Sequence, residues 1–159
     1  MSENILEIRH LGKSFGTHEV LRDIDFTVKK GDVISIIGAS GCGKSTIFRL
    51  VNKLLTPASG VIRVDGESIE TKKNYCGYMP QQDLLFPWRT VRENLMLPME
   101  IQGGYSKEQM QKKADDALRS VGLADWGDKT PKELSGGMRQ RAAFARTVLT
   151  GSDLLLLDE

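Results

Sequence analysis

Apolar positions along the chain form short runs rich in Ile and Val, which alternate with longer stretches of helical spacing. The short runs predict strands, and the leucine run near the end of the chain is typical of a parallel strand covered on both faces. A hairpin is expected at Asp65-Gly66, because this pair accepts the positive φ angles of a type I′ turn. The expected strands are Ile5–Ile8, Ile24–Val28, Val33–Ile37, Val61–Val64, Glu67–Ile69, Gly77–Met79 and Leu154–Leu157.

Helical spacing predicts four helices of unequal length. The clearest start is Ser106, which forms a capping box with Gln109. A mostly helical block from about residue 87 to 150, flanked by β patterns, indicates a helical insertion in an α/β core. The expected helices are Ile47–Leu54 before Pro57, a segment from Ser106 to Gly122, about Arg139–Thr150, and about Thr90–Met96 before Pro98.

Composition is that of an ordinary globular chain. Of 159 residues, 40% are hydrophobic and 27% are charged, and the net charge of +1 shows no basic excess that would suit a nucleic-acid backbone. The aliphatic runs are too short to cross a bilayer. The two cysteines, Cys42 and Cys76, fit neither a disulfide framework nor a metal-ligand spacing, so a reducing cytoplasm is the expected compartment.

The sharpest chemical signal is the segment Gly38–Ser45, which fits the pattern G-x-x-x-x-G-K-[ST] at every fixed position. Its glycines let backbone N–H groups converge on an anion, and the following helix N-terminus adds partial positive charge. Lys44 is suited to the β- and γ-phosphates of a nucleotide and the Ser45 hydroxyl to Mg²⁺. The residues expected to bind the nucleotide here are Gly38, Ala39, Ser40, Gly41, Cys42, Gly43, Lys44, Ser45 and Thr46.

Two acids directly follow the leucine run. An acid after a buried strand lies at the carboxyl edge of the sheet, where phosphate loops also lie. We therefore expect Asp158 to hold Mg²⁺ and Glu159 to polarise the attacking water as general base. Taken alone this hexapeptide is a weak signal, and the phosphate loop gives it meaning.

A second anion cradle is predicted at Ser135, Gly136 and Gly137, which stand before a helix in the sequence LSGGM. The alternative is a simple helix start, with Ser135 as the cap. Two phosphate cradles in one chain suggest that one nucleotide is shared between two chains.

The ordered set of phosphate loop, Gln81, LSGGM and LLLLDE resembles the nucleotide-binding subunit of an ATP-binding-cassette (ABC) transporter over essentially the whole chain. Met138 stands where the commonest family signature has Gln, and the stretch from Asp83 to Val91 is similar to the nitrate, sulfonate and taurine importer class. The resemblance implies an α/β P-loop NTPase (RecA-like) core, an N-terminal antiparallel β subdomain and an inserted helical subdomain, incomplete at the C-terminus. Core and β subdomain would span about 1–86 and 151–159, and the helical subdomain about 87–150.

The same resemblance assigns roles to three further positions. Phe15 would stack on adenine rather than only pack at a strand end. Gln81, rather than its neighbour Gln82, would touch Mg²⁺ and the attacking water. Phe86-Pro87-Trp88 would receive a coupling helix of a permease, and the alternative there is a buried aromatic turn.

The function implied is that of an ATP-binding and ATP-hydrolysing importer subunit. Its cofactors would be ATP and Mg²⁺, and its partners a second copy in a head-to-tail dimer, permease subunits and, indirectly, a substrate-binding protein, with no nucleic acid. It would lie in the cytoplasm at the inner face of the membrane. The alternative is a soluble ABC-type ATPase without a membrane partner. Family members continue past the catalytic glutamate, so we expect a fragment that is poorly active alone.

Overall fold

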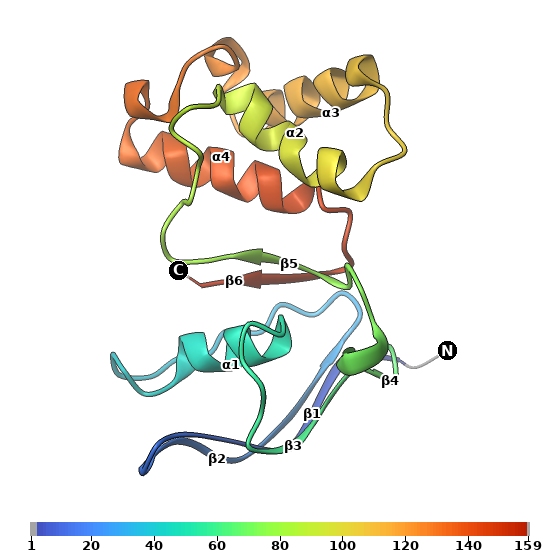
Figure 1. The fold of residues 1–159 in the computed structure, drawn as a ribbon, viewed down its shortest axis with the longest axis vertical. Helices are drawn as coiled ribbons and strands as arrows, with labels where there is room; N and C mark the ends of the chain where they lie inside the picture. Colours follow the sequence, from blue (N-terminus) through green and yellow to red (C-terminus); the bar gives the residue numbers. More distant parts are fainter. Residues whose placement is uncertain (1–2, 159) are drawn as a thin grey trace. The chain divides into compact units, whose positions relative to one another are not determined.

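The computed structural model describes residues 3–158, which form two compact units (Figure 1). The first extends to Cys76 and the second begins at Gly77. Each unit is described by itself.

The first unit is built on a four-stranded antiparallel sheet with strand order β2-β1-β3-β4. Asp65 and Gly66, with φ of 52° and 80°, confirm the predicted turn between the last two strands. The second arm of this hairpin is shorter than predicted, because Ile69 begins a 3₁₀ turn instead. The elements are β1 (Asn4–Phe15), β2 (His18–Lys29), β3 (Ser59–Val64), β4 (Glu67–Ser68) and η1 (Ile69–Thr71).

One α-helix belongs to the first unit, α1 (Lys44–Val51). Its residues Ile47, Leu50 and Val51 are buried, and in the sheet of the same unit Ile8 and Leu11 are fully buried. The helix ends earlier than predicted, because Lys53 adopts a left-handed backbone with φ of 61°. Leu54 is consequently 65% exposed rather than part of the buried stripe.

The strand predicted at Val33–Ile37 is not formed. Within residues 3–158 this segment belongs to no sheet, and the side chains of Val33 and Ile37 are each 93% exposed. A strand exists only where a neighbouring segment accepts and donates its main-chain hydrogen bonds. The apolar pattern of residues 33–37 indicates a segment suited to burial, but it does not determine whether another strand lies beside that segment.

The second unit contains three helices and a two-stranded sheet, whose strands run in the same direction in Figure 1. Its core is a cluster of apolar residues from all three helices, among them Leu95, Leu118 and Ala142, each 0–1% exposed. The elements are β5 (Cys76–Met79), α2 (Val91–Gln102), α3 (Lys107–Ser120), η2 (Ala124–Trp126), η3 (Pro131–Glu133), α4 (Gly136–Val148) and β6 (Leu154–Leu157).

Several local predictions can be compared with this unit. The Ser106 capping box is confirmed, with both reciprocal bonds to Gln109 present. Pro98 does not end α2 but lies inside it, because packing against α3 and α4 outweighs the loss of one helical hydrogen bond. Leu154–Leu157 forms a strand, but its faces are not both covered: Leu155 and Leu157 are 37% and 46% exposed.

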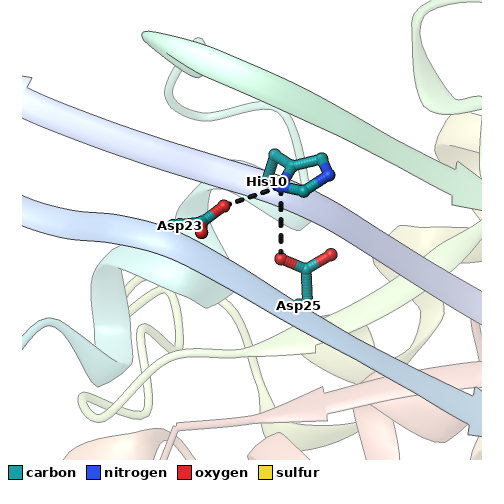
Figure 2. A group of neighbouring side chains, drawn as sticks. All are labelled: His10, Asp23 and Asp25. Atoms are coloured by element: carbon teal, nitrogen blue, oxygen red, sulfur yellow. Dashed lines mark hydrogen bonds and ion pairs between the residues drawn. The ribbon is translucent and has the colours of Figure 1, made fainter.

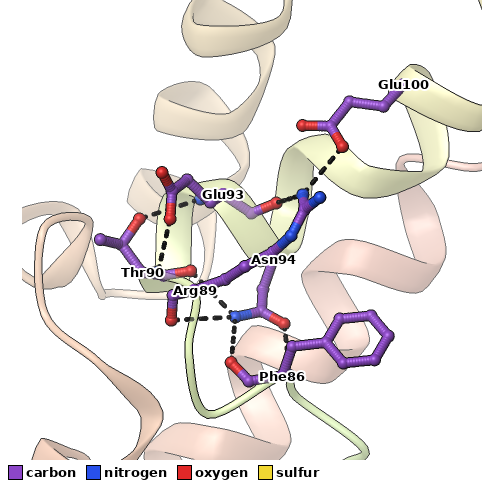
Figure 3. A network of polar contacts seen from close by, with 6 residues as sticks. All are labelled: Phe86, Arg89, Thr90, Glu93, Asn94 and Glu100. Atoms are coloured by element: carbon purple, nitrogen blue, oxygen red, sulfur yellow. Dashed lines mark hydrogen bonds and ion pairs between the residues drawn. The ribbon is translucent and has the colours of Figure 1, made fainter.

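A buried amide fixes the turn that precedes α2 (Figure 3). The side chain of Asn94 is fully buried; its Oδ1 accepts from the N–H of Phe86 at 2.7 Å, and its Nδ2 donates to the carbonyls of Phe86 at 3.1 Å and Thr90 at 2.9 Å. Arg89, in the same turn, forms an ion pair at 2.8 Å with Glu100, which lies further along α2. The aromatic turn at residues 86–88 is therefore anchored to α2 through one side chain.

We expect Asn94→Ala to lower the free energy of unfolding by about 1–3 kcal/mol, because it leaves the buried N–H and C=O of Phe86 without their partner. Urea denaturation measures this change. The control is Gln102→Ala, an exposed position at the end of the same helix. If the urea midpoint of Asn94→Ala equals that of Gln102→Ala, Asn94 does not anchor the turn.

Candidate functional site

The predicted phosphate loop lies in the first unit and leads directly into α1. Gly43 is the N-cap residue of α1, with φ of 102°, and no side chain caps the helix there. A Cβ at this position would lie 2.8 Å from Leu21 and 3.1 Å from Val20, so the close approach of the sheet also requires glycine. The first-turn N–H groups of α1 have no partner within the helix, which suits them to an anion.

Lys44 is the first residue of α1, and its side chain turns back to the preceding loop. Its ammonium donates to the main-chain carbonyls of Gly38 and Ala39, both at 2.8 Å. A positive charge is thus held against the loop backbone immediately before the open helix end. The arrangement concentrates cationic and N–H donors in one short segment, which is the chemistry that phosphate oxygens require.

Phe15 is the last residue of β1 and lies in the same unit as the phosphate loop. Its ring is 48% exposed, and the ammonium of Lys13 lies 5.2 Å from the ring centroid. An exposed aromatic ring with a cation beside it has a free surface for a second planar group. Simple packing at a strand end would bury the ring, so its exposure is compatible with the predicted stacking role.

Asp158 and Gln81 lie in the second unit, near the ends of the two strands of its sheet. The carboxylate of Asp158 is buried and accepts from the hydroxyl of Tyr78 at 3.3 Å, while its N–H donates to Met79 at 2.9 Å. Gln81 is exposed, and its carbonyl accepts from the side chain of Gln140 at 3.3 Å. The predicted general base, Glu159, lies outside the described residues.

Ser135 is the N-cap residue of α4. Its hydroxyl accepts from the N–H of Met138 at 3.3 Å, as the alternative reading of a helix start requires. Gly136 and Gly137 are exposed, and a Cβ at Gly137 would meet nothing within 4 Å. The segment is therefore a capped helix start whose backbone is open to solvent.

Sequence reasoning missed four residues that hold these segments in place. Tyr78 contacts Asp158, and Asp83 pairs with Arg139 at 3.0 Å. Arg146 donates to the carbonyls of Asp83 and Leu84, both at 2.9 Å. Arg139 and Arg146 are about two helical turns apart, so a shared helix face was the signal that could have revealed them.

A separate titratable cluster lies on the exposed face of β1 and β2 (Figure 2). Nδ1 of His10 lies 2.7 Å from Asp23 and 3.6 Å from Asp25, and one donor atom from each residue lies within 4.8 Å of the others. The hydrogen bond to Asp23, with the charges of both carboxylates, raises the pKa of His10, and Arg9 opposes this. The cluster is an exposed ion-pair group.

Comparison with known proteins gives a consistent result. The family model described as "ABC transporter" matches residues 21–159. The ATP-binding protein YtlC of Bacillus subtilis, described as an uncharacterized ABC transporter protein, is 46% identical over 139 residues, which cover 87% of this chain and 53% of YtlC. The aliphatic sulfonates import ATP-binding protein SsuB of Bacillus cereus is 39% identical to this chain. The match covers all of this chain and 62% of SsuB.

A solved structure resembles the fold closely. A dimeric ATP-binding cassette in a post-hydrolysis state, bound to ADP and Pi, superposes with a TM-score of 0.87 at 28% identity, covering 97% of this chain and 73% of that chain. The chain thus spans roughly half to two thirds of the length of the curated relatives named above. Within residues 3–158, none of the helices has the length and apolar character needed to span a bilayer.

We expect the pKa of His10, followed by NMR, to lie above its ordinary value of 6.5, and Asp23→Asn to lower it more than Asp25→Asn does, because the Asp23 hydrogen bond is the largest cause. Protonated His10 favours the fold, so its stabilising contribution is fully present below pH 6.5 and is lost as pH rises through the raised pKa. An unchanged pKa in Asp23→Asn would contradict the pairing.

Proposed function

We propose that this chain, which belongs to the ABC transporter family, is part of the ATP-binding and ATP-hydrolysing subunit of an importer. The observation that carries the proposal is the Gly38–Ser45 loop, where the Lys44 ammonium lies against main-chain carbonyls beside an uncapped helix N-terminus. The family match and the relative named for sulfonate import support the same function.

In this proposal the phosphates of ATP bind the N–H groups of the loop, and Lys44 leaves its carbonyl partners to contact the β- and γ-phosphates. The half-exposed ring of Phe15 stacks on adenine.

Ser45 in the first unit, and Gln81 and Asp158 in the second, each offer a hydroxyl, amide or carboxylate oxygen of the hard kind that Mg²⁺ prefers, and each is proposed as a candidate ligand by its own chemistry. The ion would neutralise charge on the phosphates. Gln81 would orient the attacking water, and Glu159 would accept its proton. Tyr78 would hold the Asp158 carboxylate in place through the hydrogen bond described above.

The partner copy enters through Ser135–Gly137, whose open backbone would face the nucleotide bound to the other subunit. A permease would dock on the aromatic turn at residues 86–88, where Trp88 is 75% exposed and its ring centroid lies 5.0 Å from that of Phe86. The predicted helical subdomain, about 87–150, would carry both contacts. The subunit would lie at the cytoplasmic face of the membrane, with a substrate-binding protein acting on the permease from the other side.

Lys44→Ala tests the phosphate loop in the complete protein. Loss of a charged partner in a buried pair costs about 3–5 kcal/mol, so we expect ATP affinity measured by calorimetry to fall at least about a hundredfold. Lys73→Ala, which removes the same charge from an exposed position in the first unit, is the control. Equal ATP affinity in the two variants would overturn the assignment.

Phe15→Ala tests the adenine contact separately from the phosphates. Base–aromatic stacking is worth about 1–3 kcal/mol, so ATP should bind roughly 5- to 150-fold more weakly. Inorganic triphosphate should bind as it does to the unchanged protein, since it carries no base. If Phe15→Ala weakens the binding of ATP and of triphosphate equally, the ring stabilises the conformation of the phosphate loop and does not contact the base.

A further inference from the structure

The segment that carries Gln81, residues 80–86, is held along its length by side chains of α4. We call this segment the Gln81 loop. In Figure 1 it leaves β5 and passes beside α4 before it reaches α2. Gln140 donates to the carbonyl of Gln81 at 3.3 Å, and Arg146 donates to two carbonyls further along the loop.

Arg146 fixes the middle of the Gln81 loop. Its two terminal nitrogens donate to the carbonyls of Leu84 and Asp83, both at 2.9 Å, so the planar guanidinium spans consecutive peptide groups. Leu84 has a φ of 45°, a conformation that non-glycine residues rarely adopt. Burial lowers the pKa of Arg146, and the charge of Asp83 opposes that shift. The strained turn is thus stabilised from α4.

Arg139 joins the Gln81 loop to the start of α4. Its Nε donates to Oδ2 of Asp83 at 3.0 Å, and its Nη1 donates to the carbonyl of Leu134 at 2.9 Å. Oδ1 of Asp83 accepts from the N–H of Leu85 at 3.2 Å, so both carboxylate oxygens are engaged. Leu134 directly precedes Ser135. One guanidinium therefore connects the loop of Gln81 to the segment of Ser135–Gly137.

These two segments serve different nucleotides in the proposed function, on which this inference rests: Gln81 acts on the nucleotide of its own subunit and Ser135–Gly137 on that of the partner. We propose that the Asp83–Arg139 pair, which is the link nearest to Ser135–Gly137, adds to the bonds from Gln140 and Arg146 in making the two segments move as one body, and so contributes to the coupling of the two ATP sites of the dimer. Arg139 is a positioning residue, because it acts on both sites through other groups. A rigid connection between two ligand contacts transmits a shift at one to the other.

The test is ATP hydrolysis by the complete protein as a function of ATP concentration. For two coupled sites we expect a Hill coefficient between 1 and 2 in the unchanged protein, and a lower coefficient in Asp83→Asn and in Arg139→Gln, in which Gln140 and Arg146 still hold the loop to α4. Asp83→Asn keeps the size of the side chain, and its melting temperature verifies that it folds. ATP affinity measured in the monomeric state should stay within about twofold in both variants.

The matched control is Arg141→Gln, which removes the same charge from α4. Arg141 donates to the carbonyl of Val121 at 2.7 Å, a partner outside the Gln81 loop, so its variant should keep the Hill coefficient of the unchanged protein. The double variant Asp83→Asn with Arg139→Gln should lose no more cooperativity than either single one.

Two results would overturn the coupling: an unchanged Hill coefficient in folded Asp83→Asn, or a coefficient of 1 in the unchanged protein. An equal loss in Arg141→Gln would also overturn it, because the effect would then belong to the charge of α4 and not to the pair. Failure of the unchanged protein to bind ATP would overturn the proposed function instead. The two failures are therefore distinguishable.

Discussion

Main-chain polar groups in irregular segments need hydrogen-bond partners, and in this chain polar side chains from helices provide several of them. Lys44 donates to carbonyls of the loop before α1, and Asn94 satisfies the turn before α2. Arg139 and Arg146 do the same for the segment between β5 and α2. Each donor stands on a regular helix, which restricts its position. The segments with candidate chemistry therefore have defined conformations without a ligand.

This arrangement gives α4 two tasks in the second unit. One side packs small residues such as Ala142 and Ala143 into the core, which lets the helix approach its neighbours closely. The same face carries Arg139 and Arg146, which donate to the Gln81 loop beside this core. A ligand that contacts that loop or the start of α4 acts on a packed body rather than on a flexible segment. Preorganisation of this kind lowers the cost of ordering on binding.

Local chemistry was readable from the sequence wherever all partners lie close along the chain. The phosphate-loop pattern, the Ser106 capping box and the Asp65-Gly66 turn each involve neighbouring residues, and the motifs together predicted the family that the comparisons show. The connection of Asp83 to Arg139 was not readable, because the two lie 56 positions apart and many acidic and basic residues could pair. The anchoring role of Asn94 was missed for a similar reason, since a buried amide looks the same in sequence as an exposed one.

The sequence by itself determined which segments are apolar, where helices begin and which residues suit a phosphate. Only the tertiary structure decided what the apolar runs become. Val33–Ile37 and Leu154–Leu157 have the same character, yet the second pairs with β5 while the first pairs with no strand within residues 3–158. Pro98 likewise remains inside α2, where a local rule predicted an end. The physical reason is that sheet hydrogen bonds and core contacts are made with distant segments, so the residues of a run cannot determine them alone.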